Sequence, residues 1–305
     1  MGPSRITFLL ALGATLLAAD ADLADRPRTP AEAGATVTVT AEASEVDLAQ
    51  TPNPIKVLDA DAIQQSGATN LGDVLPLLLP GQILSYGGAG TGTNLYLGGG
   101  RAKDVVVLLD GIRITDPSST SPSFSDFSLD GVGRLEVMQG PASTRYGTDT
   151  HGGAIAMYSA APEKEGLSGY ASIGAGNRDV RRAEVAPAYA WEGGWLRVSA
   201  STNQEEQSIP ANDPYHAHSE SLNFGQAIGQ DGLLTLTYRN HYRFTPLPFS
   251  SQYLAPTYAY SPYFNPERRS TERDQDIIGS YRQAFGPAWL MEVSFGHVAE
   301  DRVEP

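Results

Sequence analysis

The hydrophobic and polar positions of this chain follow different patterns in its two halves. In the second half they alternate: within LLTLTYRNHYRF, Leu234, Leu236 and Tyr238 fall on one face, and Thr235 and Arg239 fall on the other. A period of two is typical of β-strands with one apolar face. Seven segments, each about as long as a tilted membrane-spanning strand, share this pattern, near residues 167–177, 181–191, 195–206, 217–228, 233–244, 273–285 and 288–300.

The connections between these segments indicate the kind of sheet. Those at 192–194, 229–232 and 286–287 are minimal, whereas the loops at about 207–216 and 245–272 are long. Outer-membrane barrels have short periplasmic turns and longer outer loops, with aromatic girdles at both lipid interfaces. All three Trp flank a short turn. The pattern therefore predicts antiparallel transmembrane strands, and the alternative interpretation is a soluble β-sandwich.

Residues 50–162 have a mixed α/β pattern instead. The sequence IKVL predicts a strand, and DADAIQQSG predicts a short helix capped by Asp59 or Asp61 and ended by Gly67. A second helix is predicted in TNLGDVLPLLLPG, where Leu71, Val74, Leu75 and Leu78 have helical spacing. DVVVLLDG, RLEVMQG and GGAIAMYS predict three further strands.

The N-terminus has the features of a secretory signal peptide. Arg5 precedes an apolar run from Ile6 to Ala19, and small residues follow at the predicted cleavage site. The run is shorter than the ~20 residues that a membrane-spanning helix needs, which makes an N-terminal anchor the weaker alternative. The sequence thus predicts export.

Composition excludes several classes of function. A formal net charge of −14 argues against a nucleic-acid partner, and the absence of Cys excludes thiol chemistry. The chain has no phosphate-binding loop and neither G-x-S-x-G nor H-E-x-x-H, so no enzyme activity and no cofactor are expected. His216 and His218, with Asp213 nearby, are too few ligands for a metal site to be favoured.

Seven strands do not close a barrel, because single-chain bacterial barrels have even strand numbers from about eight upwards. A small barrel is also filled by its own side chains and leaves no room for the preceding α/β unit. The chain is therefore interpreted as the N-terminal fragment of a longer protein.

Four stretches resemble the motifs of TonB-dependent outer-membrane receptors. ATVTVTA resembles a TonB box, and VLDADAIQQSGATNLGDVLPLLLPG resembles the first strand and helices of the plug domain. DVVVLLDGIRI is similar to the central plug strand, and LEVMQGPASTRYGTDTHGGAIAMYS to the signature that closes the plug. Within the family, the pattern looks most like the vitamin B12 (cobalamin) receptor group.

The resemblance implies a domain organisation. A signal peptide would occupy residues 1–19, and a flexible N-terminus with the TonB box at 35–41 would occupy residues 20–49. An α+β plug domain would follow at 50–162, and the first seven strands of an incomplete, ~22-stranded barrel at 163–305. The protein would then lie in the bacterial outer membrane, in contact with its lipid, after export through the periplasm.

The resemblance also implies a partner for the isolated strand-like run ATVTVTA. Periplasmic TonB would add a strand to the edge of the box, by β-augmentation. The candidate TonB-binding residues are Thr36, Val37, Thr38, Val39 and Thr40, on a tether that is unpaired until TonB arrives. The alternative is that this run is the plug's own first edge strand.

The resemblance places a ligand at the outer end of the plug. SYGGAGTGTN (85–94) and DPSSTSPSFSD (116–126) would form the floor of the site, and the Tyr-rich loop at about 245–272 would form its wall. The candidate ligand-binding residues are Tyr86, Asn94, Ser119, Phe124, Tyr253, Tyr258 and Tyr260. The alternative is an ordinary outer loop that packs on itself.

Two features depart from the family pattern. The family's plug arginines pair with barrel carboxylates, but here Arg101 follows LYLGGG and Gln139 precedes the Gly-Pro step. The sequence leaves open whether these residues keep that latch. The calcium-binding loops of some cobalamin receptors are not evident either.

The expected function is TonB-driven uptake of a scarce, large ligand. Cobalamin is the first choice of ligand and a ferric siderophore the second. An alternative of another class is a truncated fragment that binds but does not transport.

Overall fold

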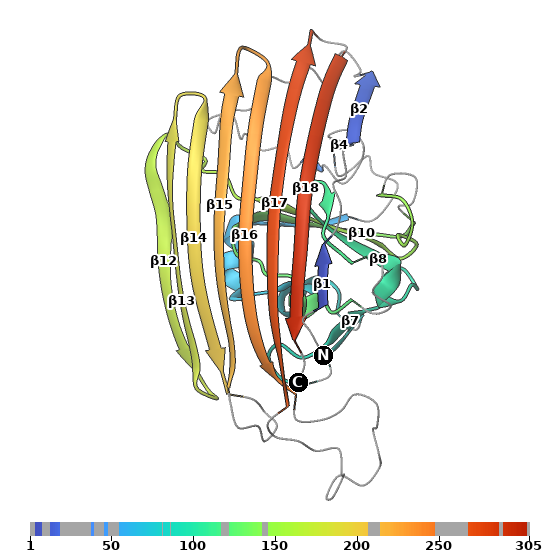
Figure 1. The fold of residues 1–305 in the computed structure, drawn as a ribbon, viewed down its shortest axis with the longest axis vertical. Helices are drawn as coiled ribbons and strands as arrows, with labels where there is room; N and C mark the ends of the chain where they lie inside the picture. The colour runs from blue at the N-terminus through green and yellow to red at the C-terminus, as the bar shows by residue number, and fades with distance from the viewer. Residues whose placement is uncertain are drawn as a thin grey trace, which may run out of the picture.

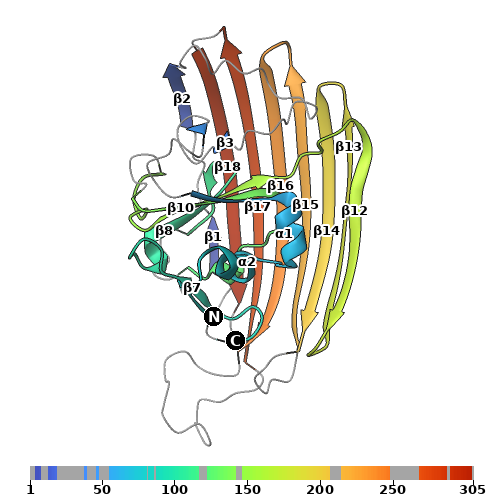
Figure 2. The same cartoon turned by 180° about the vertical axis from the view of Figure 1, so that it is seen from behind.

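A computed structural model describes a long curved sheet and a smaller globular unit packed against its concave side (Figures 1 and 2). We call the curved sheet, from residue 166 to 303, the wall, and residues 55–160 the globular unit. The described residues are 4–7, 13–18, 38–39, 46–47, 55–80, 82–85, 87–116, 122–141, 146–206, 214–247, 268–286 and 289–303.

The wall consists of seven long antiparallel strands, each paired with the next along the chain. Their bounds agree with the predicted segments to within a few residues, so the strand prediction is confirmed. The strands are β12 (Gly166–Gly176), β13 (Val180–Trp191), β14 (Gly194–Glu205), β15 (Tyr215–Ile228), β16 (Gly232–Pro246), β17 (Arg269–Phe285) and β18 (Trp289–Val303).

The alternating pattern separates the two faces of the wall. In β16, Leu234 and Leu236 are exposed on the convex face, whereas Thr237, Arg239 and Arg243 are buried on the concave face. The pattern is that of a barrel wall with an apolar outside and a polar inside. The β13–β14 and β15–β16 turns lie at one end of the wall, and the β12–β13 turn lies at the other (Figure 1).

The globular unit is built on a five-stranded sheet. In spatial order it contains β5 (Ile55–Asp59), β10 (Val132–Gln139), β11 (Gly153–Ser159), β8 (Val105–Leu109) and β9 (Ile112–Arg113). Only the β11–β8 pair is parallel within this sheet. The β8–β9 turn uses Asp110 and Gly111, both with positive φ, as its Asp-Gly sequence predicts.

Two helices cover the sheet, and both begin and end where the sequence predicts. Helix α1 (Ala60–Ser66) is capped by the Asp59 carboxylate, which accepts a hydrogen bond from the Ala62 amide, and it ends at Gly67 in the left-handed conformation. Helix α2 (Leu71–Leu78) is capped by Asn70. No helix in the described ranges is long and apolar enough to cross a membrane.

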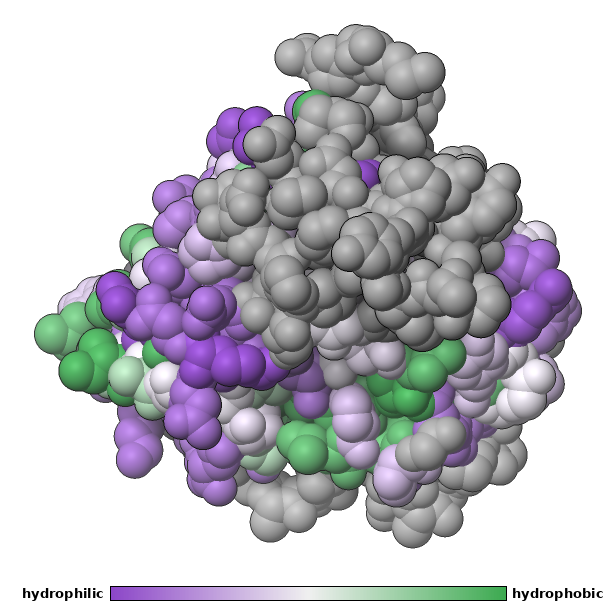
Figure 3. Space-filling model, turned by 90° about the horizontal axis from the view of Figure 1, so that it is seen from below, coloured by the Kyte–Doolittle hydropathy of each residue, from purple (hydrophilic) through white to green (hydrophobic). Residues whose placement is uncertain are grey.

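The described part of the globular unit also contains four short elements. They are the hairpin β6 (Ile83–Ser85) and β7 (Thr93–Leu95) and the single turns η3 (Ala102–Asp104) and η4 (Phe124–Asp126). Seen from below the view of Figure 1, hydrophobic groups reach the surface in separate patches with hydrophilic groups between them (Figure 3).

One apolar core lies between the helices and the sheet. Its fully buried members include Val74 and Leu75 of α2, Leu109 of β8, Leu135 of β10 and Ile155 of β11. Burying such side chains stabilises a fold by roughly 1.5–3 kcal/mol each, so this core contributes much of the stability of the globular unit.

Two N-terminal segments pair with the wall. Strands β1 (Ser4–Thr7) and β2 (Gly13–Ala18) run antiparallel to β18. They pair with the edge of β18 that does not face β17. An edge strand presents unpaired N–H and C=O groups, which any extended segment satisfies. The signal peptide expected at residues 1–19 stays a prediction.

Candidate functional site

The structure describes part of the expected ligand floor. Asn94 lies in β7 opposite Leu84 of β6 and is partly exposed. Tyr86 and Ser119 lie outside the described residues, as do Tyr253, Tyr258 and Tyr260 of the loop at about 245–272. The assignment of these residues to a ligand site stays a prediction.

Phe124 does not have the expected role. Its side chain is 0% exposed and belongs to the apolar core, where its ring lies 6.1 Å from that of Phe127. The sequence FSDF was interpreted as loop, but its aromatic residue packs inward from the single turn η4. Phe124 therefore supports the floor from below and offers no surface to a ligand.

The floor loop approaches the wall closely at Gly90. This residue has a φ of +72°, and a Cβ atom placed on it would lie 2.3 Å from the Tyr215 ring of β15. Its carbonyl oxygen also accepts a hydrogen bond of 3.5 Å from the Thr245 hydroxyl of β16. The backbone conformation and the space both require glycine at this position.

The concave face of β16 carries most of the polar contacts with the globular unit. Thr237 donates to the Asp110 carboxylate at 2.8 Å. Two residues further along, Arg239 donates from Nη2 to the Ser128 carbonyl. Arg243 donates from Nη1 to the Ser125 carbonyl at 2.9 Å. These alternate positions share one face of the strand, so a single strand contacts three separate parts of the unit.

Arg243 is the centre of a buried charge network. It is 2% exposed, lies 2.7 Å from the Asp126 carboxylate and forms an ion pair with Glu272 of β17. Arg302 of β18 approaches the other oxygen of Glu272 at 2.8 Å. A buried charge is tolerated only when it is paired and hydrogen-bonded, and the globular unit supplies two of the partners of Arg243.

Strand β15 adds contacts beside β16. The hydroxyls of Ser128 and Ser219 lie 3.2 Å apart, and Ser219 in turn contacts His241 Nδ1 at 2.7 Å. The Asn223 amide donates to the Gly131 carbonyl at 3.1 Å. Every one of these contacts joins polar groups.

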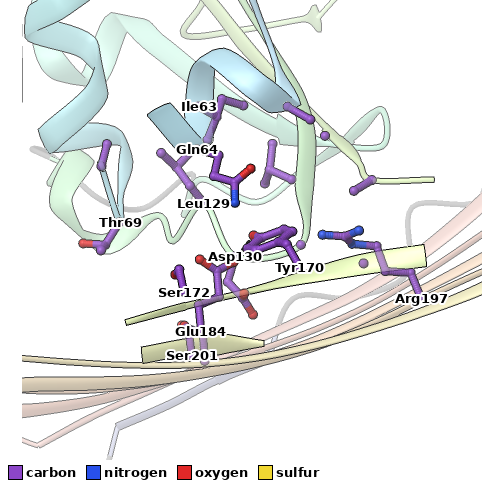
Figure 4. Close-up of a pocket in the computed structure, with 18 of the residues that line it drawn as sticks. Ile63, Gln64, Thr69, Leu129, Asp130, Tyr170, Ser172, Glu184, Arg197 and Ser201 are labelled. Atoms are coloured by element: carbon purple, nitrogen blue, oxygen red, sulfur yellow. Dashed lines mark hydrogen bonds between the residues drawn. The ribbon is translucent and has the colours of Figure 1, made fainter. Parts of the chain in front are cut away.

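A cavity of about 1010 Å³ lies between the globular unit and the wall. Asp130 lies between the helix carrying Ile63 and Gln64 and the strands carrying Glu184 and Ser201 (Figure 4). A cavity this large with polar walls has room for many water molecules.

Asp130 is a buried carboxylate in this cavity. Asp130 is 8% exposed. Among the described residues, neither of its carboxylate oxygens accepts a hydrogen bond. Burial raises its pKa to about 6, against the opposing attraction of the Arg239 guanidinium. The pKa of Asp130 therefore lies above that of an ordinary Asp.

Comparison with known proteins identifies the globular unit. Residues 47–154 match the family described as the TonB-dependent Receptor Plug Domain. This chain carries a TonB-dependent receptor plug. The globular unit contains that plug domain, and the wall consists of antiparallel strands of a partial barrel.

Curated relatives support the same assignment. The chain is 24% identical over 194 residues to the vitamin B12 transporter BtuB of Photobacterium profundum, covering 64% of this chain and 32% of that protein. It is 28% identical over 190 residues to BtuB of Vibrio vulnificus, covering 62% and 30%. The chain spans about a third of the length of these relatives.

Solved structures share the fold. The pyoverdine receptor FpvA of Pseudomonas aeruginosa, bound to pyoverdine, superposes with a TM-score of 0.74 at 18% identity, covering 90% of this chain and 42% of that one. The siderophore receptor PiuA of Acinetobacter baumannii gives 0.67 at 19% identity, covering 92% and 40%. These likenesses establish the plug-and-barrel fold of the chain.

The structure describes two residues of the expected TonB box. Thr38 and Val39 form strand β3 (Thr38–Val39), which pairs with β4 (Val46–Asp47). The segment is thus paired with a neighbour in the chain, where the sequence predicted an unpaired tether. Thr36, Val37 and Thr40 lie outside the described residues. Binding of TonB here stays a prediction.

The plug arginine considered for the family latch forms a contact within the plug. Arg101 Nε lies 3.4 Å from Asp104 Oδ2 in the same turn, and its side chain is 70% exposed. Gln139, at the end of β10, pairs with Gly153 of β11. The structure instead places buried arginines on the barrel side, at Arg239 and Arg243.

Sequence reasoning missed Asp130, Arg239 and Arg243 as functional candidates. The alternation in β16 places both arginines on its polar face, and this pattern could have identified them as inward-facing charges. A charged residue on the inner face of a barrel has to meet water, a ligand or the plug, but the sequence does not say which plug segment lies opposite.

His216 and His218 lie at the outer end of β15, on its convex face. The His216 ring stacks on Phe244 with centroids 4.7 Å apart, and His218 stacks on Tyr242 at 6.2 Å. In the described ranges no three His, Cys, Asp or Glu side chains come together as a metal site would require.

Proposed function

We propose that this chain belongs to a receptor that takes up a scarce, large ligand across the outer membrane, driven by TonB. The observation that carries the proposal is the polar interface between plug and barrel. A hydrogen bond to the wall is worth about 1 kcal/mol net, or about 1.5–3 kcal/mol where the donor is charged, because water replaces it when the plug moves. Such an interface suits a plug that must rearrange during transport.

Cobalamin is the proposed ligand, and a ferric siderophore is the second candidate. The curated relatives are named vitamin B12 transporters, which favours cobalamin. The structural neighbours PiuA and FpvA are siderophore receptors, and they share only the fold with this chain.

A direct titration tests the choice of ligand. The receptor in outer-membrane vesicles would be titrated with cyanocobalamin and, separately, with a ferric siderophore such as ferripyoverdine. We expect saturable binding of cobalamin. The variant Tyr258→Ala/Tyr260→Ala should bind it at least about tenfold more weakly, since each large aromatic contact contributes on the order of 1 kcal/mol or more. Unchanged affinity in this variant would remove the loop from the site.

Pairing of the box is tested with two proline substitutions. Val39→Pro removes a ladder donor from the proposed TonB-binding strand, so we expect uptake to be lost while surface binding of the ligand is retained. Val46→Pro disrupts only the partner strand β4, and uptake should persist. If Val39→Pro transports normally, the box does not bind TonB in this way.

A further inference from the structure

The segment from Ser123 to Ser128 includes the end of the expected floor stretch at 116–126 and is bonded both to the other floor stretch, at 85–94, and to the barrel. On the floor side, the Ser125 hydroxyl donates to the Thr91 carbonyl at 2.9 Å, and the Thr93 amide donates to the Ser123 hydroxyl at 3.0 Å. We call residues 123–128 the anchor segment. It cannot shift without moving the backbone of the floor loop.

On the barrel side, two arginines of β16 hold the two ends of the anchor segment. Arg243 contacts Ser125 and Asp126 near its beginning, and Arg239 contacts the Ser128 carbonyl at its end. The two arginines are four residues apart on one strand, so their Cα atoms are about 13 Å apart along it. A strand is rigid on that scale and fixes the spacing between the two contacts.

The acceptors in the anchor segment suit an arginine fork. A guanidinium presents donors in a fixed plane, and here one Nη of Arg243 reaches both a carbonyl and a carboxylate of the plug while the other reaches Glu272. Glu272 stays with Arg243 when the plug moves, because both belong to the barrel. The buried charge therefore keeps a partner in either position of the plug.

We propose that Arg239 and Arg243 are positioning residues that fix the anchor segment, and through it the ligand floor, to the barrel. This inference rests on the proposed receptor function. The polarity is the reverse of a latch built from plug arginines and barrel carboxylates: here the barrel supplies the cations and the plug supplies the acceptors. Loss of these contacts loosens the floor while the core of the plug stays folded.

The first experiment measures the accessibility of the anchor segment without any ligand. The sequence contains no Cys, so Ser128→Cys provides a single probe at a residue that is 4% exposed. Maleimide labelling in outer-membrane vesicles would be compared between this protein and its Asp126→Asn derivative. We expect labelling to be about fivefold faster in the derivative, as for the loss of one charged hydrogen bond.

Two controls accompany the labelling. Asp149→Asn removes an acid whose ion pair with Arg113, at 3.3 Å, lies wholly within the plug, and it should leave labelling of Ser128→Cys unchanged. A probe at Ser199→Cys, which is 1% exposed on the barrel wall, should label slowly in every background. Asp126→Glu keeps the carboxylate and should restore protection of the anchor segment.

Variants of Arg243 test the barrel side. Arg243→Lys keeps the charge but loses the fork, so it should give partial loosening. Arg243→Gln alone removes the buried partner of Glu272, which then keeps only the half-exposed Arg302, and is expected to impair folding. Arg243→Gln/Glu272→Gln removes both charges together and should assemble with an accessible anchor segment.

Ligand uptake then separates positioning from general stability. In Asp126→Asn the KM for uptake should rise about tenfold, equivalent to ~1.4 kcal/mol of lost ligand binding, with the maximal rate unchanged. Equal labelling in Asp126→Asn, Asp149→Asn and the parent would overturn the proposal, whatever the ligand is. If the parent takes up neither cobalamin nor a siderophore, the proposed function fails, while the labelling result still decides the role of the arginines.

Discussion

The inside of the plug and its boundary with the barrel are built from different chemistry. Inside, Leu75, Leu109, Leu135 and Ile155 are 0% exposed and pack only against other apolar groups. At the boundary, the buried side chains of the wall are mostly Ser, Thr, Asn, Arg and Glu. Of the wall residues that the structure describes, only Ile278 joins the apolar core of the plug.

This difference separates two kinds of stability. Apolar burial is lost only when the plug unfolds, and it costs several kcal/mol for each large side chain. A hydrogen bond across the boundary is exchanged for one to water at a net cost of about 1 kcal/mol. A single hydrogen bond across the boundary is thus lost more easily than a single large side chain is exposed from the core.

The largest expected effect on uptake comes from a covalent crosslink between the plug and the wall. The Ser128 and Ser219 hydroxyls are 3.2 Å apart, so Ser128→Cys/Ser219→Cys is expected to form a disulfide between plug and wall. Oxidation should abolish energised uptake and leave ligand binding intact, and reduction should restore uptake. Radiolabelled ligand accumulation in whole cells measures both states.

The matched control for this tether lies within the wall. Ser199 and Ser221 hydroxyls are 2.6 Å apart on neighbouring strands β14 and β15, so Ser199→Cys/Ser221→Cys crosslinks the barrel to itself. Uptake should be insensitive to its oxidation. Equal uptake through both oxidised proteins would mean that the plug keeps its contact with β15 during transport.

The next effect is on the core. Leu135→Ala removes a side chain that is 0% exposed at the centre of β10 and should lower the free energy of unfolding of the plug by about 3 kcal/mol. Urea unfolding followed by hydrogen exchange of the plug strands measures this loss. Leu196→Ala, on the exposed face of β14, should leave plug unfolding unchanged. A similar loss in both variants would contradict an independent plug core.

A smaller effect is expected from pH at Asp130. Its pKa in the folded protein is about 6, above its ordinary value of 3.8, so the folded plug binds the proton more tightly than the unfolded chain. Stability should therefore rise as pH falls from 7.5 to 5, by about 1 kcal/mol from this residue. The Asp130→Asn variant should lack this increment in urea unfolding at the two pH values. The same pH dependence in both proteins would show that Asp130 is not the group responsible.

The smallest effect is at a single boundary contact. Thr237→Val keeps the shape of the side chain but removes its 2.8 Å hydrogen bond to Asp110, which still accepts from the Ser159 amide at 2.8 Å. We expect a loss of about 1 kcal/mol or less, measured as plug unfolding in urea. A double-mutant cycle with Ser159→Ala gives the coupling across the boundary. A loss as large as that of Leu135→Ala would remove the distinction between core and boundary.

The sequence by itself determined the local elements on both sides of this boundary. Alternation of period two gave the seven wall strands, because each must present one apolar and one polar face. Asp59 and Gly67 marked the ends of α1, because caps satisfy backbone groups within a few residues. These signals are local, so they can be read without knowing what the element packs against.

Only the tertiary structure decided which plug residues meet which wall residues. Arg239 and Arg243 were visible as inward-facing charges, but their partners Ser128, Ser125 and Asp126 lie more than a hundred residues earlier in the chain. The burial of Phe124 was hidden for the same reason. Contacts between distant segments depend on how the plug is placed against the barrel, and no local periodicity records that placement.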